Sequence, residues 1–153
     1  MGKQNYSTEE WRVVGGAPFY AAAFVVSSAK HHAAGAIRDM LTSANALRVL
    51  EPSTPLLAAV QADMTGPNGD PGSTKHTPEN IQRLRELLTQ AAVLVTTHDP
   101  EEAEAYKKAV LDIATTAAAA SKDGILGLSG ERINADEQAA LTELEAIFTI
   151  SAT

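Results

Sequence analysis

A chain of 153 residues has the usual size of one domain, and with 44% hydrophobic and 20% charged residues it is too apolar and too weakly charged to stay disordered. No apolar run approaches the roughly 18–20 residues that cross a bilayer, so we expect no membrane partner. The net charge of -7 and the scattered 12 Lys and Arg residues disfavour a nucleic-acid partner, because that binding depends largely on neutralisation of phosphates by basic side chains.

Two helices are predicted in the first part of the chain. The capping box Ser7-Thr8-Glu9-Glu10 marks the start of the first helix, which carries Trp11 inward, and Gly15-Gly16 is expected to end it. Pro18 is predicted to begin the second helix, because proline fits the first helical position, where the N–H has no partner. The large apolar residues of this helix cover all its sides and indicate a buried, central position: Phe19, Tyr20, Phe24, Val25 and Val26.

The next stretch is predicted to hold two more helices and a loop. A helix over residues 34–50 has Ile37, Met40 and Leu41 on one face. A shorter helix follows Ser53-Thr54-Pro55, again with proline at the first helical position. Turn-forming glycine, proline and asparagine residues then predict a surface loop over residues 65–76.

A pair of antiparallel helices is predicted after this loop. Thr77-Pro78-Glu79 opens the first helix, and Asp99-Pro100-Glu101-Glu102 is read as a capping box that opens the second. The very short connection favours a helical hairpin with His98 near its turn. The inward stripes are Ile81, Leu84, Leu88, Ala91 and Val95 in the first helix, and Tyr106, Val110, Ile113, Ala114 and Ala117 in the second.

A last helix is predicted from Asn134-Ala135-Asp136-Glu137 onward, after a loop over residues 122–133, with Ala140, Leu141, Leu144 and Ile147 inward. No alternation with period two persists, and the β-branched run at residues 93–97 ends an already periodic helix. We therefore predict an all-α fold. It should be a compact single-domain bundle of about six or seven helices over residues 1–153, with residues 1–6 flexible.

The histidines are the first candidates for chemistry, because imidazole titrates near neutral pH and is a common metal ligand. His31 and His32 point roughly 100° apart on a helix, so they could share a metal only where the helix breaks, beside Gly35, with Asp39 as a further ligand. The alternative is a solvated or hydrogen-bonded pair at a helix boundary. The chain has no cysteine to supply thiolate ligands, and we expect no cofactor.

One polar stripe predicts a ligand pocket. Tyr20, Phe24, Ser27 and His31 follow one helical face at intervals of four, three and four residues. If this face turns inward, amphipathic side chains with polar tips would line an apolar wall, as a small-molecule site requires. The alternative is a half-exposed face without a ligand.

Two segments resemble known proteins. Thr8-Glu9-Glu10-Trp11 with Ala17-Pro18 resembles the start of small uncharacterised all-helical bacterial proteins. The stretch from Asp123-Gly124 to residues 133–141 is similar to the TerB-like helical domains of tellurite resistance, where an Asp-Gly precedes a helix with an acidic start. Those domains keep a short acidic spacing thought to bind a divalent metal, whereas a glycine-rich insertion follows Asp123 here. The resemblance implies a fold and not an activity.

We expect a non-enzymatic helical domain that acts through a protein partner or through self-association, because catalytic motifs are missing and the helices are rich in alanine. The lack of cysteine agrees with a reducing compartment, so we expect the cytoplasm. The alternative function is a small-molecule or metal-binding protein, or an enzyme, with a pocket near Tyr20, Ser27 and His31. A buried cavity ringed by these residues would favour the alternative, and an exposed apolar patch would favour association.

Overall fold

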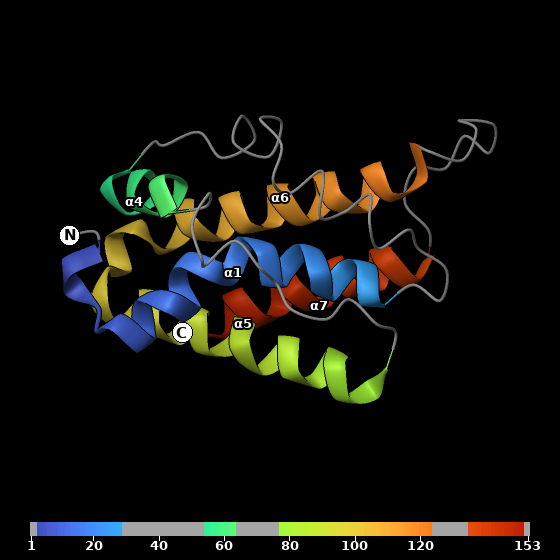
Figure 1. Ribbon diagram of the computed structural model, residues 1–153, viewed down its shortest axis with the longest axis horizontal. Helices are drawn as coiled ribbons and strands as arrows, with labels where there is room; N and C mark the ends of the chain where they lie inside the picture. The colour runs from blue at the N-terminus through green and yellow to red at the C-terminus, as the bar shows by residue number, and fades with distance from the viewer. Residues whose placement is uncertain (1–2, 29–53, 64–76, 124–134, 152–153) are drawn as a thin grey trace.

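The computed structural model describes residues 3–28, 54–63, 77–123 and 135–151, which form helices without any strand among them (Figure 1). The α-helices are α1 (Thr8–Ser27), α4 (Pro55–Asp63), α5 (Pro78–His98), α6 (Ala103–Asp123) and α7 (Ala135–Ser151). Short 3-10 turns, η1 (Lys3–Asn5) and η3 (Pro100–Glu102), precede α1 and α6. The all-α prediction is confirmed. The count of six or seven helices is not, because the described residues contain five α-helices and the helix predicted over residues 34–50 lies outside them.

The central helix is α1, as the all-round apolar pattern after Pro18 predicts. It packs against α5 and α6 and also contacts α4 and α7. Its side chains Phe19, Phe24 and Val25 are fully buried. Figure 1 shows α1 and α6 running in one direction and α5 and α7 in the other. A helix enclosed in this way can be apolar on every side.

The predicted break at Gly15-Gly16 is wrong, because α1 continues through both glycines and through Pro18. A proline inside a helix has no N–H to donate to the carbonyl four residues earlier, which here belongs to Val14. The hydroxyl of Tyr106 in α6 donates to this carbonyl oxygen over 2.7 Å, in a buried position. A side chain from a neighbouring helix therefore supplies the hydrogen bond that Pro18 removes.

Gly16 does not end a helix; its lack of a side chain leaves space for the ring of Tyr20. A Cβ atom added to Gly16 would lie 2.8 Å from Cζ and 2.9 Å from the hydroxyl oxygen of Tyr20. The tyrosine ring thus lies back over the preceding turn of α1, in the space that the missing side chain leaves. A larger residue at this position would have to displace the end of the tyrosine ring, so the glycine allows this close approach.

Three predicted helix starts are confirmed. Ser7 Oγ accepts from the Glu10 N–H over 3.1 Å, and the Glu10 carboxylate accepts from the Ser7 N–H over 2.7 Å, which completes the capping box. Thr77 Oγ1 caps α5 and Thr54 Oγ1 caps α4, in each case by accepting a backbone N–H three residues later over 3.2 Å. The predicted inward residues that the structure describes as buried are Leu84, Leu88, Ala91, Val95, Tyr106, Val110, Ile113, Ala114, Ala140, Leu141 and Leu144.

The predicted capping box at Asp99 is wrong. Residues Pro100–Glu102 form a 3-10 turn, α6 begins at Ala103, and the Asp99 side chain makes no capping hydrogen bond. The carboxylate instead accepts from Asn5 Nδ2 and from the hydroxyl of Tyr6, each over 2.7 Å. We predicted residues 1–6 to be flexible, and within the described part of that segment the Tyr6 side chain is 8% exposed.

Candidate functional site

The predicted ligand face on α1 lies against other helices where the structure describes it. Phe24 and Ser27 are both fully buried. Ser27 Oγ accepts from the amide Nδ2 of Asn80 in α5 over 3.3 Å, so its polar tip is used between two helices. Tyr20 is half-buried over Gly16. The fourth member of the face, His31, lies outside the described residues.

The metal site predicted at His31, His32 and Asp39 also lies outside the described residues. Within the part of the chain that the structure does describe, no three His, Asp or Glu side chains are grouped so that they could hold a metal ion.

A groove of about 460 Å³ follows the outer face of α5. Val93 belongs to it and is the one large hydrophobic side chain in the described residues that counts as exposed, with 48% of its surface accessible. Tyr20, Phe24 and Ser27 are not among the side chains that line it. We call this surface the α5 face, and it consists of Gln82, Arg85, Glu86, Thr89, Gln90, Val93 and Leu94.

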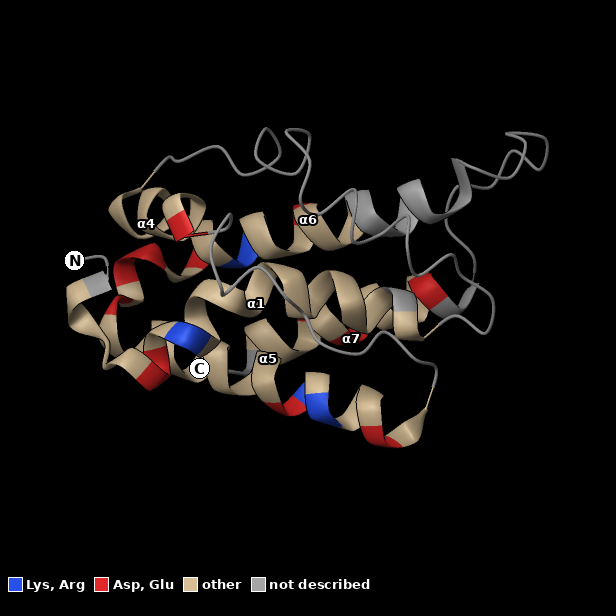
Figure 2. Ribbon diagram, in the orientation of Figure 1, with Lys and Arg blue, Asp and Glu red and all other residues tan. Residues whose placement is uncertain are grey.

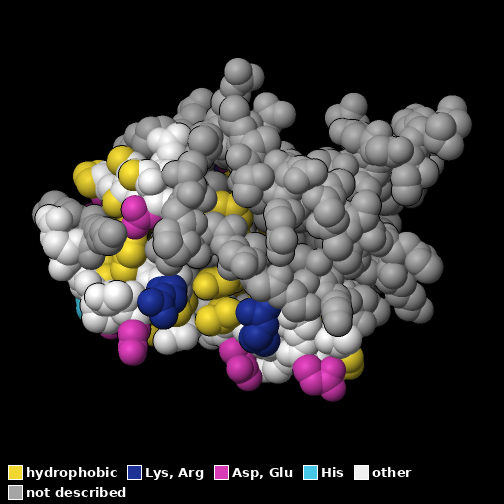
Figure 3. All heavy atoms as spheres, viewed as in Figure 1, with side chains coloured by type: hydrophobic (Ala, Val, Ile, Leu, Met, Phe, Trp, Pro, Cys, Tyr) yellow, Lys and Arg dark blue, Asp and Glu magenta, His cyan; other side chains and the backbone are white. Residues whose placement is uncertain are grey.

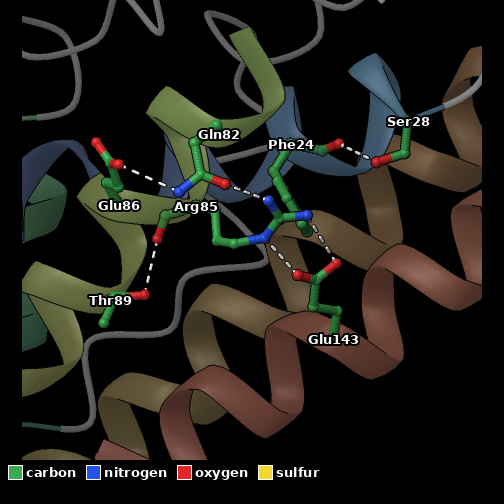
Figure 4. A network of polar contacts seen from close by, with 7 residues as sticks. All are labelled: Phe24, Ser28, Gln82, Arg85, Glu86, Thr89 and Glu143. Carbon is green, nitrogen blue, oxygen red and sulfur yellow. Dashed lines mark hydrogen bonds and ion pairs between the residues drawn. The ribbon is translucent and has the colours of Figure 1, made fainter. Parts of the chain in front are cut away.

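Arg85 is the best-fixed side chain of the α5 face (Figure 4). Its guanidinium donates to both carboxylate oxygens of Glu143 in α7, over 2.5 and 3.4 Å, and to the side-chain oxygen of Gln82 over 2.5 Å. Gln82 in turn donates to Glu86 over 3.1 Å. The same guanidinium lies over the ring of Phe24, 5.8 Å from its centroid. These contacts join α5, α7 and α1 and order the polar half of the groove.

Charge is distributed unequally over the helices. The ionised side chains of α5 balance, with Glu79 and Glu86 against Arg83 and Arg85 (Figure 2). The sequence of α7 has acidic residues and no basic one. On the face in Figure 3, the basic side chains that the structure describes form two separate groups with hydrophobic atoms between them, and no continuous basic patch. The α5 face is therefore close to neutral on a chain whose net charge is -7.

A second polar cluster holds the start of α1 against the corner between α5 and α6. Burial raises the pKa of the Tyr6 hydroxyl, which donates to Asp99, and the Asp99 charge raises it further. The pKa of the Glu10 carboxyl is lowered, chiefly by the Ser7 N–H and also by His98, whose Nε2 lies 3.5 Å away. All these groups have hydrogen-bond partners, so the cluster has a structural role and holds the start of α1 against the residues that connect α5 to α6.

The corner also anchors α4. Glu102 accepts from the Leu56 N–H at the start of α4 over 3.0 Å and is 7% exposed. Burial raises the pKa of the Glu102 carboxyl, and the neighbouring carboxylates of Asp99 and Glu101 add to the increase, while the Leu56 N–H acts in the opposite direction. A carboxylate in such surroundings is less stable in its charged form than in water.

Sequence reasoning missed the α5 face. Arg85 and Glu143 are far apart in the chain, and no local pattern connects them. The sequence did contain a signal for this surface. Gln82, Thr89 and Val93 carry no charge and recur along one side of the helix, and the predicted inward stripe lies on the opposite side.

Comparisons with known proteins give no match to a family model, to a curated protein or to a solved structure. The resemblance to small bacterial helical proteins and to TerB-like domains therefore stays a prediction. Among the described helices, none combines the length and the apolar character that a transmembrane segment needs.

Proposed function

We propose that the protein is a non-enzymatic helical domain that acts by self-association, and that the α5 face is the surface at which two copies meet. The observation that carries the proposal is the exposure of Val93 within the groove, because every other large hydrophobic side chain that the structure describes is buried or partly buried. An exposed apolar side chain in a groove with a polar rim is typical of interaction surfaces.

Charge supports a second copy at this face. Two chains of net charge -7 repel one another, and the repulsion is greatest where acidic surfaces approach. The charges of α5 balance, whereas α7 contributes only acidic side chains, so two copies can approach along the α5 face at a lower electrostatic cost than along α7. Complementary charges also arise within such a pair, because Arg85 and Glu86 lie side by side on each copy.

The order of the α5 face supports binding as well. Arg85 is fixed by Glu143, Gln82 and the ring of Phe24 before any partner arrives. A side chain that is already ordered loses little conformational entropy on binding. One helix face is nevertheless small beside the roughly 800 Å² per partner of a standard interface, so we expect a weak, concentration-dependent dimer.

Sedimentation equilibrium over a series of protein concentrations tests the proposal. The wild-type chain should show a rising average mass, and Val93→Glu should remain a monomer because it places a charge in the centre of the contact. The control is Thr115→Glu, which adds the same charge at an exposed position of α6, on the other side of α1. A monomeric wild type at every concentration, or equal dimerisation of Val93→Glu and the wild type, would refute self-association through α5.

The cytoplasm remains our proposal for the location, supported by the lack of cysteine. A different protein as partner and a pocket near Tyr20, Ser27 and His31 stay predictions without an added observation in their favour. If the wild type is monomeric, a search for a partner protein of the α5 face becomes the next test, with Val93→Glu as its negative control.

A further inference from the structure

The C-terminal half of α5 contains an uncharged stretch that is nearly symmetric about Val93. Residues 89–97 have the sequence TQAAVLVTT, with threonines at both ends and no ionisable side chain. The exposed members of this stretch are Thr89, Gln90, Val93 and Thr97. The outward side of the stretch therefore has a similar character when it is read in either direction.

Two threonine hydroxyls of this stretch have acceptors within α5. Thr89 Oγ1 donates to the carbonyl of Arg85, and Thr96 Oγ1 donates to the carbonyl of Ala92, each over 2.8 Å. A hydroxyl that is bonded in this way does not become an unsatisfied donor when water leaves it. Both threonines can therefore be covered by another helix at little cost, and they extend the contact surface on both sides of Val93.

We propose that two copies pair with their α5 helices antiparallel, about a two-fold axis that passes beside Val93. This inference rests on the proposed self-association through the α5 face. In such a pair Val93 lies against Val93 of the second copy, because a two-fold axis brings the residue beside it into contact with its own copy. Residues at equal distances before and after Val93 on the same flank also meet, which places Gln90 beside Thr97 of the second copy.

The charged side chains of α5 favour this arrangement over two others. Arg85 and Glu86 precede the uncharged stretch, so they lie at the rim of the contact and keep their water. A parallel pair would place Glu86 opposite Glu86 and would align the two helix dipoles in the same direction, and both effects are unfavourable. An antiparallel pair centred on Thr89 would place Val93 opposite Glu86, whose carboxylate would lose water against an apolar side chain.

Engineered disulfides can report the arrangement, because the chain has no cysteine of its own. A disulfide requires Cα atoms within about 7 Å, and facing residues of two helices whose axes lie about 8–10 Å apart meet this limit. Val93→Cys should therefore cross-link with itself on mild oxidation. A mixture of Gln90→Cys and Thr97→Cys chains should cross-link too. Neither of these two variants should cross-link alone, because like positions lie about 9 Å and about 12 Å apart along the helix axes.

The oxidation is carried out at a concentration at which sedimentation shows the wild type above its monomer mass, and the products are read by non-reducing electrophoresis. Thr115→Cys, at an exposed position of α6, is the control for random collision and should give only background cross-linking. Thr89→Cys mixed with Thr96→Cys provides an independent pair on the other flank of α5. This second pair should behave as the first.

Three results would overturn the inference, and they separate it from the proposed function. If Gln90→Cys or Thr97→Cys alone cross-links as efficiently as their mixture, the helices are parallel. If the wild type associates but no variant cross-links above the Thr115→Cys background, the axis does not pass beside Val93, and self-association stands without this arrangement. If the wild type is monomeric at every concentration, the proposed function fails and this inference fails with it.

Discussion

The hydrogen bond from Tyr106 to Val14 replaces the one that Pro18 cannot make, and its removal should destabilise the protein by a predictable amount. Tyr106 is 1% exposed, and burial raises the pKa of its hydroxyl, so the group stays a neutral donor. Tyr106→Phe keeps the ring, with its tilted contact to Phe148 at 6.0 Å, but leaves the carbonyl of Val14 buried without this partner. The expected cost is about 1–3 kcal/mol, the penalty of an unsatisfied buried polar group.

A double-mutant cycle with Pro18→Ala isolates this cause. Alanine has a backbone N–H that can donate to the Val14 carbonyl along the helix, so in the Pro18→Ala background the loss of the tyrosine hydroxyl should cost clearly less. The two substitutions should therefore be coupled by about 1 kcal/mol or more. The four proteins are compared by urea unfolding, which gives the free energies, and by thermal unfolding, in which each 1 kcal/mol should appear as a change of roughly 2–4 °C in Tm; both are followed by circular dichroism. Equal costs of Tyr106→Phe in both backgrounds would show that the hydroxyl does not compensate for the proline.

Three further predictions concern α1. Trp11→Ala should cost about 3–5 kcal/mol in urea unfolding, because the side chain is 3% exposed, and equal stability of mutant and wild type would show that the ring is not part of the core. Gly16→Ala should stabilise the protein by up to about 1 kcal/mol in a Tyr20→Ala background, where the Cβ has space, and by less in the wild type; the same gain in both would contradict the close approach. Glu10→Gln should lower the Tm at neutral pH, and the difference from the wild type should shrink as the pH falls below 4.5. The pKa of Glu10 is lowered in the folded protein, so the carboxylate stabilises the fold above the ordinary pKa of 4.5 and loses this effect as the pH falls through the folded pKa. A difference in Tm that stays constant with pH would refute this.

Helix starts were predictable where one side chain and the adjacent backbone decide the structure. Ser7 and Thr77 accept hydrogen bonds from N–H groups three residues later, and no other part of the protein is needed for that. The same reasoning failed at Asp99, although the residue type is equally suited to a cap. Its carboxylate accepts hydrogen bonds from Asn5 and Tyr6 instead, which lie more than ninety residues earlier in the chain. A local rule cannot choose between a local and a distant donor.

The break predicted at Gly15-Gly16 failed for a related reason. Glycine and proline lower the helical propensity of a segment, but both effects can be offset by contacts from other helices. Here the Tyr20 ring occupies the space beside Gly16, and Tyr106 restores a hydrogen bond to the carbonyl of Val14. The all-round apolar pattern that followed Pro18 was the more reliable signal, because burial on every side requires neighbours on every side.

The enclosure of α1 also explains why function is better sought on α5. A ligand that reached Ser27 would have to displace Asn80, which donates to it from α5, and the Phe24 ring is covered by the guanidinium of Arg85. Binding there would require the central helix to part from a neighbour, at the cost of buried apolar contacts. By contrast, α5 packs on α1 with one side and presents Thr89 and Val93 on the other. A partner can occupy that side without opening the core, so a bundle built around one enclosed helix can bind most readily through the outer faces of the helices that surround it.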